Sequence, residues 1–252
     1  MSEPRYDYSG KVVAITGAGA GIGKAAAVAF AAAGAEVFVL DNDVPAGEAT
    51  AAAVSGGATF VACDVTDENS VAAAFARVGE EHGRLDVLIN NAGGFWEQLT
   101  VEETSLDDWR AVLDLNLTGV FLCARAAIPL LRESSAGRLI NLGSLAGQTT
   151  MYRSSPPYAA AKAGVHSLSR VLAYELAADG ITCNALSPSM VATERITVVR
   201  SEEERAESAA SVPMRRYGLP EEVVAVLLFL ASEASGYITG QTIPVNGGRW
   251  MG

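Results

Sequence analysis

The most constraining feature of the sequence is a regular alternation of short apolar runs, rich in β-branched residues, with longer alanine-rich stretches. The runs predict strands at about 11–16, 35–41, 58–63, 85–90, 137–143, 181–187 and 242–246. The stretches between them predict helices at 21–33, 45–54, 67–82, 105–132, 157–178 and 219–232. Strands that alternate with helices form βαβ units with parallel strands. No linker, repeat or low-complexity tract divides the chain, so we expect one α/β domain over residues 1–252.

Charge and composition argue against several classes of function. The net charge is −11, and the 18 Lys and Arg residues form no cluster, which argues against nucleic acid or an anionic membrane as partner. No apolar run approaches the roughly 18–20 residues of a membrane span, and no secretory signal is recognisable, so we expect a cytoplasmic protein. Cys63, Cys123 and Cys183 lie far apart in apolar contexts, and His82 and His166 match no ligand spacing. We therefore expect reduced cysteines and no metal site.

A strand, a glycine-rich turn and a helix follow one another in KVVAITGAGAGIGKAAAVAF, residues 11–30. Its glycines let the backbone turn sharply and approach a pyrophosphate, whose charge is met by helix N-terminal amides. An acidic protein can bind a dinucleotide in this way without basic side chains. The spacing is TGxxxGxG, with Gly17, Gly21 and Gly23, and Ile22 stands where a strict GxGxxG has its third glycine. The alternative interpretation is a plain tight turn.

The second predicted strand, AEVFVLD, ends at Asp41. A carboxylate at this point can accept both ribose hydroxyls of adenosine, and it repels the 2′-phosphate of NADP. Ala18 and Ala20 in the glycine-rich turn add no cation that would bind that phosphate, and neither do Asn42 and Asp43. The sequence therefore predicts NAD as the cofactor, although a strand-terminal Asp can also simply start a turn.

Tyr158 and Lys162 lie four residues apart in SPPYAAAKAG, where Pro156 and Pro157 favour the start of a helix. This spacing places both side chains on one helix face. An ammonium close to a phenol favours the phenolate form, so the tyrosine can exchange protons near neutral pH. Alone the pair is weak evidence, because the same spacing occurs by chance on many helix surfaces.

Several further motifs, in the same order and with similar spacing, resemble those of the short-chain dehydrogenase/reductase family over nearly the whole chain. They are TGAGAGIG at 16–23, CDV at 63–65, NNAG at 90–93, Asn116 in LDLNLTGVF, Ser144 in INLGS, YAAAK at 158–162 and ITGQTIPVNGG near the end. The resemblance implies a Rossmann-type doubly wound parallel sheet of seven strands in the order 3-2-1-4-5-6-7, with helices on both faces.

The resemblance also implies roles for individual residues. Ser144 would polarise a substrate carbonyl, and Tyr158 would act as general acid or base. Lys162 would also bind the nicotinamide ribose, and Asn116 would hold a water on the proton path. The implied cofactor-binding set is Gly17, Gly21, Ile22, Gly23, Asp41, Asp64, Val65, Asn90, Asn91, Ala92, Gly93, Tyr158, Lys162, Val191 and Thr193. Without the family, Ser144 would be interpreted as a cap and Asn116 as a structural polar residue.

Two departures from the family pattern lie near the expected substrate. The interval from Ser144 to Tyr158 is a residue or so longer than in many members, which predicts a reshaped loop. Ser189 follows Pro188 where the family commonly has Pro-Gly, so a non-glycine must adopt the backbone of that turn, and the contact at Val191 is in question. The polar residues 188–218 predict either a substrate loop that covers the site or a solvated surface excursion.

Together these features predict an NAD(H)-dependent oxidoreductase that interconverts a secondary alcohol and a ketone. The alternatives are an NADP(H)-dependent 3-oxoacyl carrier-protein reductase, a non-catalytic dinucleotide-binding regulatory protein, and an epimerase or dehydratase on the same fold. Candidate walls of the substrate pocket are Phe95, Trp96, Leu145, Met151, Tyr152, Met190 and Ile196, and Arg153 or Arg195 could anchor an anionic substrate. By analogy with the family, we expect a homotetramer packed through 105–132, 157–178 and the last strand and helix, with Trp250 and Met251 in a subunit contact.

Overall fold

A seven-stranded parallel sheet forms the centre of the molecule in the computed structural model, which describes residues 6–54, 56–149, 154–194 and 201–251. The strands are β1 Val12–Thr16, β2 Glu36–Asp41, β3 Ala58–Ala62, β4 Val87–Asn90, β5 Arg138–Leu142, β6 Thr182–Pro188 and β7 Thr242–Val245. Their order is β3-β2-β1-β4-β5-β6-β7, which confirms the predicted topology. The order reverses between β1 and β4, and ligands of such sheets bind outside the carboxyl ends at this point.

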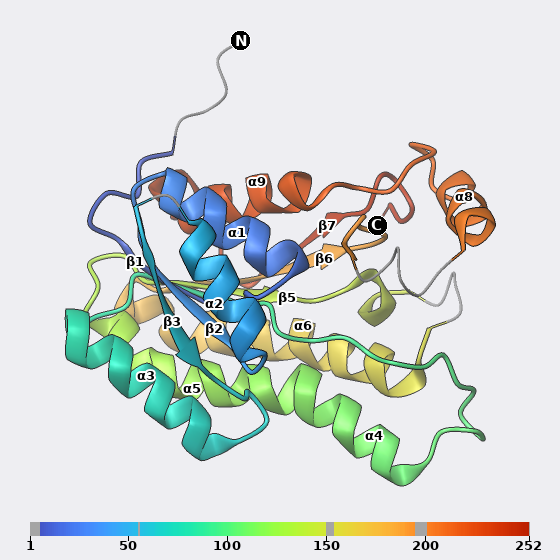
Figure 1. Cartoon of the computed structure of the whole chain (residues 1–252), viewed down its shortest axis with the longest axis horizontal. Helices are drawn as coiled ribbons and strands as arrows, with labels where there is room; N and C mark the ends of the chain where they lie inside the picture. The colour runs from blue at the N-terminus through green and yellow to red at the C-terminus, as the bar shows by residue number, and fades with distance from the viewer. Residues whose placement is uncertain (1–5, 55, 150–153, 195–200, 252) are drawn as a thin grey trace.

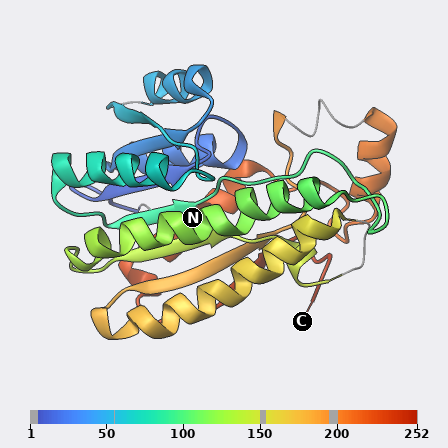
Figure 2. The ribbon, with the colours of Figure 1, turned by 90° about the horizontal axis from the view of Figure 1, so that it is seen from below.

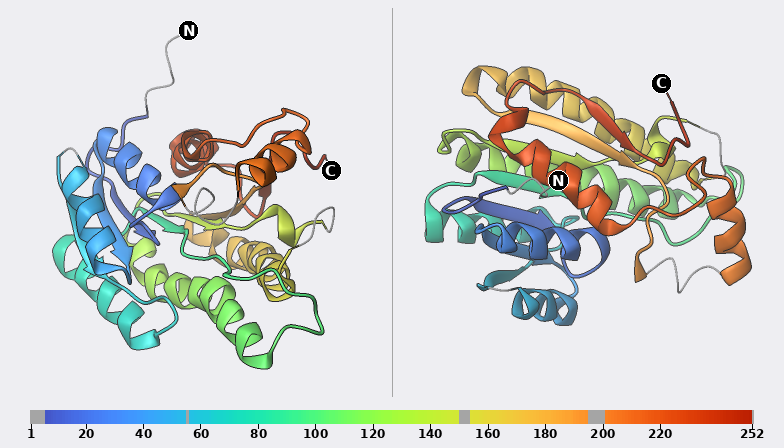
Figure 3. Two further views of the ribbon diagram at one scale, coloured as in Figure 1. Left: turned by 45° about the vertical axis from the view of Figure 1, so that its right-hand side comes forward. Right: turned by 90° about the horizontal axis from the view of Figure 1, so that it is seen from above.

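Helices cover both faces of the sheet (Figure 1). On one face lie α1 Gly21–Ala32, α2 Val44–Ala53 and α9 Pro220–Ala231, as the view from above in Figure 3 shows. On the other face lie α3 Glu68–His82, α5 Gly119–Arg132 and α6 Pro156–Leu176 (Figure 2). The strands feed both layers alternately: Val12 and Ala14 of β1 belong to the core under α3 and α5, whereas Val13 and Ile15 belong to the core under α1 and α9.

The long helix expected over 105–132 is interrupted. It consists of α4 Leu106–Leu113, a π-helical turn Asp114–Thr118 and α5, and the π-turn contains Asn116. Such wide turns frequently mark functional sites, and apolar periodicity does not reveal them because the helix continues on both sides. By length and composition this stretch could cross a membrane, which is weak evidence by itself, and five of its apolar residues belong to the buried core: Leu122, Cys123, Ala124, Ala127 and Leu131.

The polar segment expected at 188–218 contains a helix that the sequence did not predict, α8 Glu202–Ala210. It begins with a capping box, in which Ser201 and Glu204 each bond the other's backbone amide. No residue of α8 is buried, so the segment has no apolar stripe from which a helix could be predicted. In Figure 1 α8 stands apart from the layers that cover the sheet. The other predicted helices and the strands agree with the structure to within two residues.

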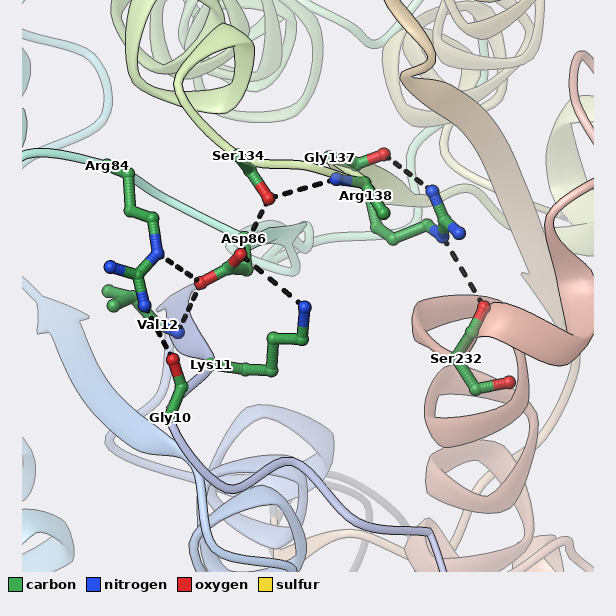
Figure 4. A network of polar contacts seen from close by, with 10 residues as sticks. Gly10, Lys11, Val12, Arg84, Asp86, Ser134, Gly137, Arg138 and Ser232 are labelled. Carbon is green, nitrogen blue, oxygen red and sulfur yellow. Dashed lines mark hydrogen bonds and ion pairs between the residues drawn. The ribbon is translucent and has the colours of Figure 1, made fainter.

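A buried carboxylate ties the amino ends of β1 and β4 to the segment before β5 (Figure 4). This edge of the sheet is opposite the carboxyl ends, where the site is expected. Asp86, directly before β4, accepts from the Val12 amide over 2.9 Å and from Ser134 Oγ over 2.6 Å. Arg84 Nε lies 3.2 Å and Lys11 Nζ 3.9 Å from the same carboxylate. Paired and hydrogen-bonded in this way, Asp86 can be buried without a large penalty, and it locks the starts of β1 and β4 together.

Candidate active site

One cavity opens at the carboxyl edge of the sheet, where the order of strands reverses. Its volume is about 690 Å³, and its lining extends from Gly17 and Gly21 at one end to Ser144 and Tyr158 at the other. Most of the lining residues follow β1, β4, β5 and β6, because the carboxyl ends of parallel strands meet at one edge, and Arg249 follows β7. A dinucleotide-binding turn and a proton-transfer pair therefore face the same space.

The glycine-rich turn has a shape that only glycines allow. Gly17 and Gly21 have φ angles of +62° and +54°, which L side chains rarely adopt. A Cβ at Gly17 would lie 2.7 Å from the Ala92 Cα atom, and one at Gly23 would lie 2.3 Å from the Gly17 carbonyl oxygen. The backbone is thus exposed at the cavity and followed by the N-terminus of α1, which is the arrangement that binds a pyrophosphate. The residues present fit a dinucleotide.

Asn91 holds this turn against the end of β4. Its Nδ2 donates to the carbonyl oxygens of Thr16 and Gly17 over 2.9 and 2.8 Å, and its own amide donates to Thr16 Oγ1 over 3.0 Å. The side chain closes the gap between β1 and β4 at the point where they diverge. A turn fixed from both strands can present its amides to a ligand without reorganisation.

Asp41 lies beside the turn at the end of β2. Its Oδ2 accepts from the Gly19 amide over 2.7 Å, and its Oδ1 accepts from the Asp43 amide over 2.9 Å. A Cβ at Gly19 would lie 2.9 Å from that Oδ2, so glycine is required for this approach. The carboxylate is therefore held in place at the adenosine end of the turn, and it brings negative charge there.

Lys162 is buried beneath Tyr158 on α6. Lys162 is only 2% exposed. Its Nζ donates to the Leu142 carbonyl over 2.6 Å and lies 5.6 Å from the centre of the Tyr158 ring. Burial lowers the pKa of this ammonium to about 8. Phe95 packs against Tyr158, and the centres of the two rings lie 4.8 Å apart. The phenol is thereby fixed between a ring and a cation.

Ser144 follows β5 and caps a short 3-10 turn, Leu145–Gly147, through a hydrogen bond from the Ala146 amide to its Oγ over 3.2 Å. His166 supports this turn from α6, where it bonds the Gly147 backbone. Burial, and then the charges of Lys162 and Arg170, lower the pKa of His166 to about 4, so its ring is neutral at neutral pH. Both the cap and the catalytic interpretation of Ser144 are thus compatible, because this residue also lines the cavity.

Asn116 is fully buried, and the structure shows what its side chain does. Its Nδ2 donates to the carbonyls of Gly94 and Val112 over 2.7 and 2.9 Å, and its Oδ1 accepts from the Gly94 amide over 2.8 Å. It therefore fixes the loop after β4 next to Lys162, whose Nζ would lie 3.2 Å from a Cβ at Gly93. The water on the proton path that the family resemblance implies for Asn116 stays a prediction.

Ser189 directly follows β6 and has ordinary backbone geometry. Among the described residues, Arg215 is the one non-glycine with positive φ, so the turn after Pro188 does not demand a glycine. The chain then passes through an isolated bridge between Val191 and Gly218 and brings the Thr193 methyl to 3.2 Å from where a Cβ of Gly21 would lie. Val191 and Thr193 both reach the cavity.

Comparison with known proteins identifies this arrangement. Residues 17–249 match the family model described as enoyl-(acyl carrier protein) reductase. The rhamnolipids biosynthesis 3-oxoacyl-[acyl-carrier-protein] reductase of Pseudomonas aeruginosa is 35% identical over 252 residues, which covers 97% of this chain and 98% of the relative. The chain belongs to the short-chain dehydrogenase/reductase family.

Other members of the short-chain dehydrogenase/reductase family differ in what their names say they act on. The cis-4-hydroxycyclohexanecarboxylate dehydrogenase of Sinomonas cyclohexanicum is 38% identical over 243 residues, 96% of this chain and 97% of the relative. The solved Pseudomonas aeruginosa RhlG/NADP active-site complex superposes with a TM-score of 0.92 at 34% identity, and covers 98% of this chain and 99% of its own. The family thus makes the chain an oxidoreductase and leaves its substrate open.

In this short-chain dehydrogenase/reductase, the cavity collects most of the residues that the sequence predicted. Those that line it are Gly17, Gly21, Ile22, Asn91, Ala92, Gly93, Ser144, Tyr158, Lys162, Val191 and Thr193. Those that lie outside the lining are Gly23, Asp41, Asp64, Val65, Asn90 and Asn116. Asn90 donates to Asn141 Oδ1 on the neighbouring strand β5 over 2.9 Å, and Asp64 Oδ1 accepts from the Thr66 amide and hydroxyl. Their side chains support neighbouring strands and turns.

The predicted substrate walls are only partly recovered. Phe95, Trp96 and Met190 line the cavity, whereas Leu145 is fully buried and does not. Met151, Tyr152, Arg153, Arg195 and Ile196 lie outside the described residues. The sequence missed Gln98, Ser154, Glu194, Tyr217 and Arg249, which also line the cavity. They come from loops and from the C-terminal segment, so no local pattern connects them to the site.

Proposed function

We propose that this protein is a nicotinamide-dinucleotide-dependent oxidoreductase that interconverts a secondary alcohol and a ketone. The observation that carries the proposal is a single cavity with a pyrophosphate-binding turn at one end and Ser144, Tyr158 and Lys162 at the other. The dinucleotide, when bound, supplies or accepts the hydride. The protein's own residues bind it, orient the substrate and move one proton.

In the direction of reduction, Tyr158 would donate its phenolic proton to the oxygen of the substrate, and in oxidation it would accept that proton. Ser144 would donate a hydrogen bond to the same oxygen and stabilise the charge that develops there. The Lys162 ammonium would stabilise the phenolate left on Tyr158, and Leu142 holds it in place through its carbonyl. These roles follow from a buried cation directly below the phenol.

For the cofactor we propose NAD(H), because of the fixed carboxylate of Asp41. Its hydrogen bond from Gly19 places negative charge where an adenosine ribose would lie beside the turn. This charge would accept the ribose hydroxyls of NAD and repel the 2′-phosphate of NADP. The secondary alcohol in the name of the Sinomonas relative supports the proposed reaction class.

The relatives favour a second candidate, an NADP(H)-dependent reductase of 3-oxoacyl thioesters. The Pseudomonas reductase is named for a 3-oxoacyl-[acyl-carrier-protein] substrate, and the RhlG complex contains NADP. Other relatives with the same activity in their names come from Vibrio harveyi and a Synechocystis strain. This support is more direct than the support for the first candidate. The carboxylate of Asp41, however, argues against NADP(H) as the cofactor.

Replacing Tyr158 with phenylalanine tests the reaction. We expect kcat for a panel of ketones and 3-oxoacyl thioesters to fall about 10²- to 10⁴-fold, because phenylalanine cannot supply the proton. Tyr174→Phe is the matched control, since Tyr174 lies on the same helix and is 89% exposed. Undiminished turnover in Tyr158→Phe would exclude the assigned proton donor. Turnover of substrate with no net change in nicotinamide absorbance would instead indicate an epimerase or dehydratase.

The ratio of kcat/KM for NADH to that for NADPH decides between the cofactors. We expect the wild type to prefer NADH, and Asp41→Asn to reduce this preference because the amide keeps the shape of the side chain without its charge. Asp43→Asn is the control, since Asp43 caps α2 from the neighbouring turn. A wild-type preference for NADPH would refute the argument from charge and leave the second candidate.

We further propose a soluble, cytoplasmic homotetramer. Support comes from large apolar side chains that are exposed on α5 and α6, among them Phe121 and Val171. Exposed apolar surface on one face commonly marks a protein–protein interface. Sedimentation analysis should give a mass near four chains, and a monomer at all concentrations would contradict the proposal.

A further inference from the structure

Two aromatic residues, Phe95 and Trp96, line the cavity at its substrate end, the end that contains Ser144 and Tyr158. Both belong to the loop that joins β4 to α4. Phenylalanine has no hydrogen-bonding group and tryptophan has only its indole N–H, so the two residues present mainly flat, apolar surface. We call Phe95 and Trp96 the aromatic wall.

Phe95 places this wall directly beside the proton donor. The centres of the Phe95 and Tyr158 rings lie 4.8 Å apart, with the ring planes inclined at 53°. Aromatic rings attract one another at this separation. The group attached to a carbonyl carbon lies close to the carbonyl oxygen, so it comes near Phe95 when that oxygen bonds the Tyr158 hydroxyl. The wall is therefore in reach of a substituent at the reacting carbon.

The backbone that carries the wall is fixed from the protein interior. Gly94, the residue before Phe95, donates its amide to Asn116 Oδ1 over 2.8 Å, and its carbonyl accepts from Asn116 Nδ2 over 2.7 Å. Asn116 is fully buried. Both polar groups of Gly94 are thus held by one buried side chain, and a wall on such a base can bind a ligand without reorganisation.

Trp96 shows that the wall has apolar surface to offer. It lines the cavity, yet 53% of the residue is exposed. Among the described residues, neither Phe95 nor Trp96 is part of the two hydrophobic cores on the faces of the sheet. Core packing therefore does not account for this pair of aromatic residues. A ligand that covers Trp96 removes a large apolar surface from water, which stabilises the complex.

Further apolar surface in the cavity comes from other parts of the chain. Met190 and Tyr217 line it from the segments that follow β6 and precede α9. The Gly218 amide donates to the Met190 carbonyl over 2.9 Å, which joins these two segments. Methionine adapts its shape to a ligand. The cavity can thus enclose a bulky apolar group whose flat side lies on the aromatic wall.

We propose that the aromatic wall binds a ring of the substrate, and that this enzyme acts on secondary alcohols and ketones whose reacting carbon belongs to a ring or is attached to one. A rigid ring loses less conformational entropy on binding than a flexible chain of the same size, and it gains the specific contacts of a flat aromatic surface. The inference rests on the proposed reaction, since Tyr158 defines where the carbonyl lies. It goes beyond that reaction by naming the substrate class and the residues that select it.

A matched pair of neutral methyl ketones tests the proposal: cyclohexyl methyl ketone and 2-octanone, which have the same number of carbon atoms. We expect kcat/KM in the wild type to favour the ring ketone by about 5- to 30-fold. Phe95→Leu and Trp96→Leu should each reduce this preference at least about threefold, because leucine keeps the apolar character without the flat surface, and each should change 2-octanone by less than about threefold. Tyr237→Leu is the control, because Tyr237 is fully exposed and lies outside the lining of the cavity, and it should keep the preference.

Three results would overturn the proposal. The first is a wild type that turns over 2-octanone, or a 3-oxooctanoyl N-acetylcysteamine thioester, as fast as the ring ketone. The second is an unchanged preference in both Phe95→Leu and Trp96→Leu. The third is an equal loss for both ketones in these variants, which would mean that the wall acts through Tyr158 and not on the ring. Trp96→Leu keeps the test decisive if Phe95→Leu does not fold, since Trp96 is largely exposed.

A binding measurement separates this inference from the proposed reaction. If the wild type turns over neither ketone, the proposed reaction fails, but saturation-transfer NMR on enzyme loaded with oxidised dinucleotide still reports binding. Stronger transfer to cyclohexyl methyl ketone than to 2-octanone, reduced in Trp96→Leu and kept in Tyr237→Leu, supports the ring site. Equal transfer to both ketones, or no change in Trp96→Leu, would show that the aromatic wall does not select a ring.

Discussion

Replacing Lys162 with methionine is expected to stabilise the fold at neutral pH while it abolishes turnover. The ammonium is buried, and burial lowers its pKa from 10.5 to about 8, so the folded state disfavours the charged form. Methionine has a similar length and no charge, and it can occupy the same space below Tyr158. The site thus holds a group that works against folding.

The expected gain follows from two opposing contributions. The lowered pKa corresponds to about 3 kcal/mol of cost for the charged lysine at pH 7. Removal of the ammonium leaves the buried Leu142 carbonyl without its partner at 2.6 Å, which costs about 1–2 kcal/mol. We therefore expect Lys162→Met to be more stable by about 1–2 kcal/mol, which for a chain of this size raises Tm by roughly 2–8 °C.

The gain should depend on pH with a definite sign. Below about pH 8 lysine is protonated in both the folded and the unfolded state, so its full cost applies. Between about pH 8 and 10.5 the unfolded state binds more protons, so the wild type becomes more stable as pH rises. Above this window the cost has vanished and only the lost hydrogen bond remains. The advantage of Lys162→Met should therefore shrink above pH 8 and reverse by about pH 10.5.

Urea denaturation of the enzyme without dinucleotide, at pH 7, 9 and 10.5, measures this directly. Lys24→Met is the control, because Lys24 is exposed on α1 and should show no such dependence on pH. A variant that is less stable than the wild type at pH 7, or whose difference does not change with pH, would refute the argument that burial of charge dominates at this position.

Two further predictions concern one position in the cavity wall and one at the opposite edge of the sheet. Gly143→Ala should lower kcat about tenfold and destabilise the fold by about 1–3 kcal/mol, because its Cβ would lie 2.1 Å from His166 Nε2 and 2.8 Å from the Leu186 carbonyl, next to Ser144. Gly79→Ala on α3 serves as the control. Normal kinetics and normal stability in Gly143→Ala would contradict the expected steric crowding. Asp86→Ala should lower the free energy of unfolding, measured by urea denaturation, by about 2–4 kcal/mol, because it leaves the Val12 amide and Ser134 Oγ without their hydrogen-bond partner. Because these groups lie at the other edge of the sheet from the cavity, kcat/KM and cofactor preference should not change. A changed cofactor preference would show that the two edges of the sheet are coupled.

The strands and their order could be predicted because each element carries its own periodic pattern. The side chains of Val12 to Ile15 alternate between the two cores on the two faces of the sheet. The glycine spacing at 17, 21 and 23 predicts a tight backbone turn, and the structure has this turn. Asn116 was found by motif, but the π-turn that bears it was not, since the wide turn leaves the apolar pattern on both sides intact. Helix α8 was missed because an exposed helix needs no apolar stripe.

The cavity walls could not be predicted for a different reason. Arg249 reaches the site through the pairing of β7 with β6 and a turn at Asn246, and nothing in NGGRW points to Ser189. Asn90 is a second case: the cofactor contact that its motif implies stays a prediction, and the structure adds that its side chain donates to Asn141. A motif gives the identity of a residue at a strand end, whereas the pleat decides on which side of the backbone its side chain lies.

The ion network around Asp86, drawn in Figure 4, lies at the amino ends of the strands. The cavity lies at their carboxyl ends, and this separation has an evolutionary consequence. Substitutions in the loops that follow the carboxyl ends can alter specificity without disturbing the contacts that join the strand starts. Substitutions at the substrate end should therefore change the free energy of unfolding little, since the contacts at the amino ends of the strands are kept. A lineage with this architecture can diversify its chemistry one loop at a time, as the varied names of its relatives illustrate.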